Sequence, residues 1–447
     1  MTRSVSRYRA FRSGVEEDNA FPLMKVTPGN LSNPHGSPSK STREKSFEDW
    51  LFEELGLSFN PFEHLDARED ARLTAYLIGH ENFARLWGTW PNLLFAPPGG
   101  GKTAFRVRLS WACRMQEERR HFFPTLFYLP NPDVVGLPPS EDLFFAELLR
   151  ATGHELLFYL AYHACEFPDW APERRYRIRQ ALALTGIPVA HYLEQIEDAG
   201  SLAPLVETAQ QTRSVDSQST LPQGANGTIP SFPREPLPDT LYAFCRMLQE
   251  TPVAPVPQRS PLEQLDILWP LILQDLGQES IFVLVDGADA YNLPPTEAIL
   301  LLEPLLRRVR EWAERKVMLK FFLPEEFYPL VKKETALLTE RAQIVIIEWP
   351  RDRLIKVLQE RLRVASRGRF DSFKAIGNPH LARDVEARLA KAADPPVPRE
   401  VIFLAQQLLA SKVWRKKADH GRLEPEDLES VLDDYKEKKN RGRSRSR

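Results

Sequence analysis

Cysteine is scarce in this sequence, with three residues in a chain of 447. Cys113, Cys165 and Cys245 lie far apart and form no CxxC pair. The sequence therefore offers neither a disulfide framework nor a cysteine-rich zinc site. We interpret the three residues as small hydrophobic side chains in a reducing compartment.

Long apolar runs are absent as well. The longest ones, such as residues 281–285, have the length of a strand and not of a membrane span. The N-terminal residues are basic but lack the apolar stretch of a secretory signal. We expect a cytoplasmic protein with no membrane partner.

Two common hydrolase signatures are missing too. The nearest approach to a zinc-protease helix is His154-Glu155, but Phe158 stands where the second histidine ligand would be. No G-x-S-x-G elbow occurs, and the histidines have no metal-ligand spacing. The sequence gives no support to either class of hydrolase.

Net charge is nearly balanced, at −2, but both ends of the chain are basic. Residues 436–447 carry seven positive charges against Glu437 alone. Residues 1–46 are rich in Ser, Pro, Gly, Asn and Arg and show no helical or strand period, so we expect disorder there and in residues 436–447. Basic tails of this kind can contact nucleic acid through its phosphates.

Buried strands are predicted by five apolar runs, at residues 92–96, 125–129, 281–285, 318–323 and 343–348. The runs lack polar alternation, which is typical of a parallel sheet covered on both faces. Helical segments separate them along the chain. We therefore predict an α/β fold with a doubly wound parallel sheet in residues 47–350.

Helical periodicity marks the other regions. It predicts short helices at residues 47–57 and 67–79 and a bundle of about four helices at residues 351–435. Residues 137–262 form a connection far longer than a normal crossover. We interpret it as an insertion, a helical subdomain followed by a Ser- and Pro-rich linker at 208–238.

The run at 92–96 leads into APPGGGKT at residues 96–103 and then into a helix. This is the Walker A pattern of a P-loop, with Ala96 in place of the first glycine. Glycines let successive N–H groups curl around a β-phosphate, the lysine bridges the β- and γ-phosphates, and the threonine hydroxyl binds Mg²⁺. The residues expected to bind a nucleoside triphosphate are Pro98, Gly99, Gly100, Gly101, Lys102, Thr103 and Ala104.

A carboxylate should face this magnesium ion from the end of another buried strand. Asp286 ends the run at 281–285, so we assign Asp286 and Thr103 to the metal. The next residue is Gly287, whereas many ATPases have a glutamate there that acts as the base. Asp289 is the nearest carboxylate and the base that we favour, although it could equally only stabilise the turn.

The sequence VLVDGAD around Asp286, with one strand between it and the P-loop strand, resembles the STAND class of P-loop ATPases and the wider AAA+ group. The resemblance covers about residues 47–435. It implies a sheet in the order 5-1-4-3-2, an α-helical lid and ATP as the nucleotide. It also implies that Arg399 reaches the γ-phosphate from the lid and that Asn60 and Phe62 wall the base.

The chain departs from these families at several points. Leu323-Pro324 ends the fourth strand, where the related families commonly have a polar sensor residue. Arg341, just before the fifth strand, stands where some AAA+ proteins have an arginine that reaches the nucleotide of a neighbouring subunit, but we interpret it as a surface arginine. We expect an ATP-driven switch with slow hydrolysis that acts with a protein partner or as a self-oligomer. The alternatives are a DNA-associated AAA+ regulator that oligomerises on nucleic acid, and a module in which ATP is only structural.

Overall fold

The structure is a computed structural model that describes residues 47–70, 72–206, 235–254, 258–334, 342–381, 383–415 and 422–445. The N-terminal tail expected at residues 1–46, most of the expected linker at 208–238 and Arg341 lie outside these ranges.

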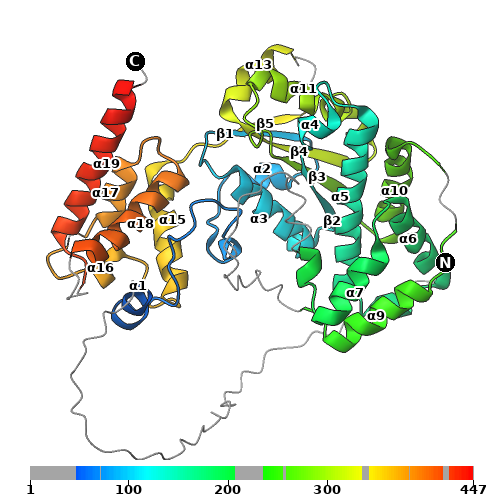
Figure 1. The fold of residues 1–447 in the computed structure, drawn as a ribbon, viewed down its shortest axis with the longest axis horizontal. Coiled ribbons are helices and arrows are strands. Elements are labelled where there is room, and N and C mark those ends of the chain that lie inside the picture. Colours follow the sequence, from blue (N-terminus) through cyan, green and yellow to red (C-terminus); the bar gives the residue numbers. More distant parts are fainter. Residues whose placement is uncertain are drawn as a thin grey trace, which may run out of the picture. The chain divides into compact units, whose positions relative to one another are not determined.

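A parallel β-sheet organises the first part of the chain (Figure 1). Its strands are β1 (Asn92–Ala96), β2 (Phe122–Tyr128), β3 (Ser280–Asp286), β4 (Val317–Pro324) and β5 (Gln343–Ile346). Every pair of neighbours is parallel, and the order is β2-β3-β4-β1-β5. The strands predicted from the apolar runs are confirmed, and their order is the one that the resemblance implies.

Helices cover both faces of the sheet because its strands are apolar on both sides. Along β1, Leu93 and Phe95 belong to one hydrophobic cluster, and Leu94 and Ala96 belong to another on the opposite face. The second cluster includes side chains of α2 (Phe83–Trp87) and α3 (Lys102–Arg114). The first is continued by α5 (Glu141–Tyr162), α10 (Pro261–Asp275), α11 (Pro295–Leu306) and α12 (Val309–Glu314). This is an α/β architecture with a covered parallel sheet.

The long connection between β2 and β3 is helical, as predicted, but its core is continuous with that of the sheet. Its further helices are α4 (Pro132–Val135), η4 (Phe167–Asp169), α6 (Pro172–Leu184), α7 (Val189–Ala199) and α9 (Pro238–Glu250). Their buried side chains fall in the same cluster as α5 and one face of the sheet. The end of α7 lies beside the start of α9, since a Cβ added to Gly200 would lie 3.6 Å from Cβ of Pro238.

The C-terminal residues form a helical bundle, as predicted. Its helices are α15 (Arg351–Ala365), α16 (Phe373–Ile376), α17 (Val385–Ala392), α18 (Pro398–Arg415) and α19 (Pro425–Arg445). Buried side chains from residues 47–62 complete its core. These residues include the short helical segments α1 (Phe47–Asp49) and η1 (Trp50–Glu54), so the segment expected with the sheet belongs by packing to the bundle.

The C-terminal tail prediction was wrong in its boundary. Residues 436–445 were expected to be disordered, but they continue α19. Acidic residues on the same helix and on the bundle offset the basic charge: Arg441 pairs with Glu437 one turn away, and Nζ of Lys439 lies 3.4 Å from Glu400.

The helix predicted at 67–79 is also wrong in length. Only η2 (Leu73–Tyr76) forms there, because Asp70 turns back to accept hydrogen bonds from Tyr76 and from Arg361 of α15. The remaining short elements are η3 (Glu117–Arg119), η5 (Glu325–Phe327) and α13 (Tyr328–Glu334). None of the helices in the described ranges has the length and apolar character needed to cross a membrane.

Candidate functional site

The turn between β1 and α3, residues 97–101, is called the glycine turn below. Gly99 and Gly101 have φ of +77° and +89°, in the left-handed region that disfavours side chains. The Gly100 N–H closes the turn on the Pro97 carbonyl at 2.9 Å. Glycine is therefore required by backbone shape at two positions of the turn.

Helix α3 starts directly from this turn. Its first backbone hydrogen bond runs from Phe105 N–H to the Gly101 carbonyl, at 2.9 Å. The N–H groups of residues 101–104 precede that bond and have no partner within the helix. Together with the positive end of the helix dipole, they form a cradle suited to an anion.

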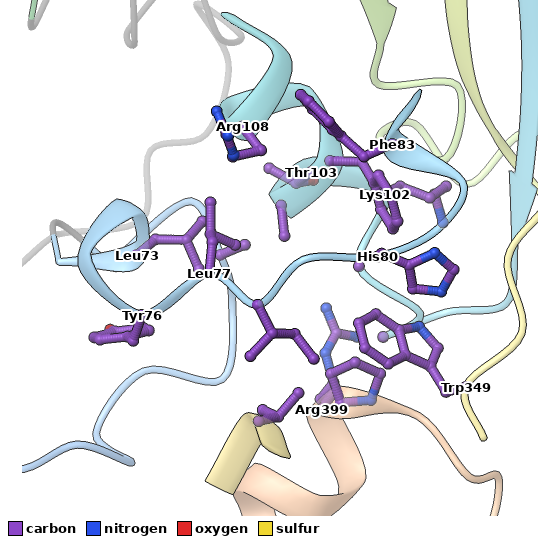
Figure 2. A pocket seen from close by; sticks show the side chains of 18 of the residues that line it. Leu73, Tyr76, Leu77, His80, Phe83, Lys102, Thr103, Arg108, Trp349 and Arg399 are labelled. Atoms are coloured by element: carbon purple, nitrogen blue, oxygen red, sulfur yellow. The ribbon is translucent and has the colours of Figure 1, made fainter. Parts of the chain in front are cut away.

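A cavity of about 560 Å³ opens beside the glycine turn (Figure 2). Its lining comes from residues 65–68 and 73–87 ahead of β1, from the glycine turn and α3, from Trp349, and from helices α15 and α18. Figure 2 shows Lys102 and Thr103 on the side of α3, with Trp349 and Arg399 across the cavity from them. The sheet part and the bundle thus both contribute to one cavity.

Lys102 carries the positive charge at the mouth of the cradle. Its side chain is 8% exposed, and Nζ lies 3.1 Å from Oδ2 of Asp289, whose side chain is 37% exposed. Asp289 therefore lies at the cavity, and in this structure its carboxylate is the partner of Lys102.

Asp286 lies behind Thr103 at the end of β3. The Thr103 hydroxyl is 3.5 Å from Oδ2 of Asp286, and the Gly287 N–H donates to Oδ1 at 2.9 Å. Arg106 of α3 donates from Nε to Oδ2 at 2.9 Å, and both side chains of this ion pair are buried. Burial alone would lower the pKa of the Arg106 guanidinium. Electrostatic interactions with Tyr128 and Asp286 outweigh this effect, so the pKa of Arg106 is raised.

The opposite side of the glycine turn is braced by Trp349 and His80. The Trp349 indole donates from Nε1 to the Gly100 carbonyl at 2.8 Å. The His80 ring packs edge to face against Trp349 and against Phe105, with centroids 5.1 Å apart in each case. Sequence reasoning missed both residues.

Helix α18 contacts the turn from the bundle. The Arg399 N–H donates to the Gly99 carbonyl at 3.3 Å, and a Cβ added to Gly99 would lie 2.7 Å from Cβ of Arg399. The Arg399 side chain is exposed and lines the cavity. Within the described part of the chain, no hydrogen bond or ion pair is recorded for its guanidinium.

A buried ion pair fixes the far wall of the cavity to α15. Arg361 donates to Asp70 at 3.0 Å and to the Pro61 carbonyl at 2.6 Å. Asp70 also accepts the hydroxyl hydrogen of Tyr76, whose pKa is raised by burial. This wall is rigidly tied to the bundle.

Most of the predicted site residues meet at the cavity. Its lining includes Pro98, Gly99, Gly101, Lys102, Thr103, Ala104, Asp289 and Arg399. Two predicted residues are not in the lining but contact residues that are. The Gly100 carbonyl accepts the Trp349 indole N–H, and Asp286 lies 3.5 Å from the Thr103 hydroxyl.

Asn60 and Phe62 do not reach the cavity. Phe62 is fully buried in the bundle core and stacks on Phe373 at 5.6 Å, while Asn60 accepts the Phe62 N–H at 3.1 Å. The cavity lining includes neither residue, which contradicts the expectation that they wall a nucleotide base there.

Thr103 and Asp286 could hold a magnesium ion only if phosphate and water supplied most of its ligands. No cluster of three or more His, Cys, Asp or Glu side chains within the described ranges could hold a metal ion alone. Mg²⁺ in phosphate sites is bound by few protein ligands together with phosphate oxygens and water. Thr103 and Asp286 are the residues that could take part in such an arrangement.

Comparisons with protein-family models, with curated proteins and with solved structures give no match.

Proposed function

We propose that this chain binds a nucleoside triphosphate, ATP, together with Mg²⁺, in the cavity beside the glycine turn. The observation that carries the proposal is the cradle of N–H groups at residues 101–104, with Lys102 and Thr103 at its edge and a cavity of about 560 Å³ in front of it. A helix N-terminus, a lysine and a hydroxyl that converge at the end of a buried parallel strand suit a polyphosphate.

Mg²⁺ would neutralise phosphate charge when bound. Thr103 would supply its hydroxyl as a ligand, and Asp286 would accept hydrogen bonds from water on the metal. Oδ2 of Asp286 already accepts from Arg106, so only part of its accepting capacity remains for the metal shell. The fit supports the metal assignment made from the sequence.

Slow hydrolysis is part of the proposal. Gly287 cannot orient a water molecule, and the buried Leu323 at the end of β4 offers no polar side chain to the site. Asp289 is the first carboxylate after Asp286 in the sequence, and it lines the cavity. Its pairing with Lys102 supports a role that starts only when phosphate takes Lys102 away.

A conformational role follows from the two-sided cavity. The bundle contacts the glycine turn directly through Arg399, and Arg361 ties α15 to the cavity wall. A ligand held by both parts would favour one relation between them over others. We propose that the chain is an ATP-dependent switch, the output of which passes to a protein partner or a second copy.

The test is calorimetric titration of ATP with Mg²⁺ into the wild-type chain and into Lys102→Ala. Loss of one charge-assisted contact should weaken binding by about ten- to a hundredfold. Lys391→Ala, on the exposed side of α17, removes the same charge away from the cavity and is the matched control. Equal ATP affinity in wild type and in folded Lys102→Ala would refute the site.

A further inference from the structure

Trp349 occupies a junction between the two parts of the molecule. It lies between the end of β5 at Ile346 and the start of α15 at Arg351. Its ring is partly buried and packs against two hydrophobic clusters, the bundle core and the sheet face covered by α3. A movement of the bundle relative to that face must therefore change the surroundings of this ring.

The same ring holds the glycine turn. In a trans peptide the C=O and the following N–H point in opposite directions. Because the Gly100 carbonyl is held by the indole N–H at 2.8 Å, the Gly101 N–H is directed away from the indole. That N–H is the first donor of the cradle, and the turn is flexible at glycine, so a fixed carbonyl presets the donor.

The indole is itself fixed by His80 (Figure 2). Nδ1 of His80 accepts the Asn82 N–H at 3.2 Å, so Nε2 carries the hydrogen and donates to the Glu348 carbonyl at 3.2 Å. The ring of this histidine cannot turn without losing both bonds. Its edge contact then limits rotation of the Trp349 ring.

We propose that Trp349 is a positioning residue that presets the glycine turn for phosphate and transmits phosphate occupancy to the bundle. The inference rests on the proposed function and names the regulation of that site. Trp349 acts on the phosphate cradle through the Gly100 carbonyl. Removal of the Trp349 indole should therefore weaken the binding of inorganic pyrophosphate and of ATP by the same factor. Loss of a contact with the adenine base would weaken the binding of ATP alone.

The chain has nine tryptophans, so labelling with 5-fluorotryptophan gives a small set of ¹⁹F resonances. The resonance that disappears in Trp349→Phe identifies Trp349. Titration of the wild type with magnesium pyrophosphate and with ATP should shift this resonance, and titration with adenosine should leave it in place. Trp90→Phe, at a site 61% exposed, is the control for labelling and assignment.

Calorimetry on the same proteins gives the second measurement. Trp349→Phe keeps an aromatic ring but loses the N–H donor, and it should weaken both pyrophosphate and ATP about fivefold. If Trp349→Phe does not fold, Trp349→His supplies the assignment and the wild-type shifts decide the question.

The two proposals fail in different ways. A wild type that binds neither ATP nor pyrophosphate removes the proposed function. A wild type that binds both, with a Trp349 resonance that does not move or with unchanged affinities in folded Trp349→Phe, overturns the role of Trp349 and leaves the proposed function standing.

Discussion

Replacing Asp289 by asparagine should tighten ATP binding and slow ATP hydrolysis. The first effect arises because Oδ2 of Asp289 is the partner of Nζ of Lys102, at 3.1 Å. A triphosphate must displace this carboxylate to reach Lys102. The variant removes the competitor and a negative charge of the same sign as the ligand.

The size of the effect follows from distance and exposure. Two unit charges 4 Å apart attract by about 1 kcal/mol in bulk water and about 4 kcal/mol near a protein surface. Asp289 is 37% exposed, so solvent screening brings the pair close to the lower value, about 1 kcal/mol. The dissociation constant of ATP should fall about fivefold.

The assay pairs calorimetric titration of ATP with single-turnover measurement of labelled ATP. Asp133→Asn, on the exposed surface of α4, makes the same change of net charge away from the cavity and should leave both quantities unchanged. If Asp289 orients the attacking water, turnover should fall by about a hundredfold or more in Asp289→Asn.

Two results would contradict the reasoning separately. Unchanged or weaker ATP binding in Asp289→Asn would mean that the Lys102 pair does not oppose the ligand. Undiminished turnover would remove Asp289 from the chemistry and direct attention to Glu325 and Glu326, which follow β4.

Further predictions address other parts of the molecule. Arg399→Ala should weaken the binding of ATP about tenfold and the binding of ADP little, by calorimetry, because the resemblance implies that Arg399 reaches the γ-phosphate, which ADP lacks. Lys320→Met should lower the free energy of unfolding in urea by about 2 to 4 kcal/mol, because it leaves the carbonyls of residues 86, 88 and 90 without their donor. Burial lowers the pKa of His154 to about 4, so the unfolded chain takes up its proton first and stability should fall by about 1 kcal/mol from pH 7 to 5.5, a dependence that His154→Phe removes. Deletion of residues 440–447 should leave ATP affinity unchanged, and if the chain is retained on DNA it should flatten the salt dependence of that retention.

The strands were predictable because burial on both faces leaves a continuous apolar run in the sequence. The meeting of Thr103 with Asp286 and of Lys102 with Asp289 was predictable for a related reason. Parallel strands end at one edge of a sheet, so residues that follow β1 and β3 are brought together there. The strand order itself came from the family resemblance and not from the residues.

Residues whose role depends on one contact far away in the sequence are not marked by any sequence pattern. Arg106 stands in an ordinary helical segment, and only the structure shows that it pairs with Asp286, 180 positions later. Trp349 binds a carbonyl 249 positions earlier. Lys320 did give a signal, since it is a lone charge within the apolar run 317–324 that a buried strand must satisfy.

Local sequence also could not assign segments to the correct core. Phe62 and the helical residues from 47 onward have the same apolar character whether they pack on a sheet or on a bundle. The choice is made by complementary side chains about 300 positions away, such as Phe373. The extent of α19 was missed because a basic composition suggested solvation, whereas Asp433 on the preceding turn and Glu437 pair with basic residues of the helix and support it.

The approach of Gly200 to Pro238 makes this point of the molecule suitable for protein engineering. Gly200 follows α7 and Pro238 starts α9, and a Cβ added to Gly200 would lie 3.6 Å from Cβ of Pro238. Gly200 and Pro238 are held close by the fold, and the entropic cost of lengthening the connection between two such points grows only slowly with its length. A fluorescent reporter domain placed between residues 207 and 234 should leave the sheet, the glycine turn and the bundle in register.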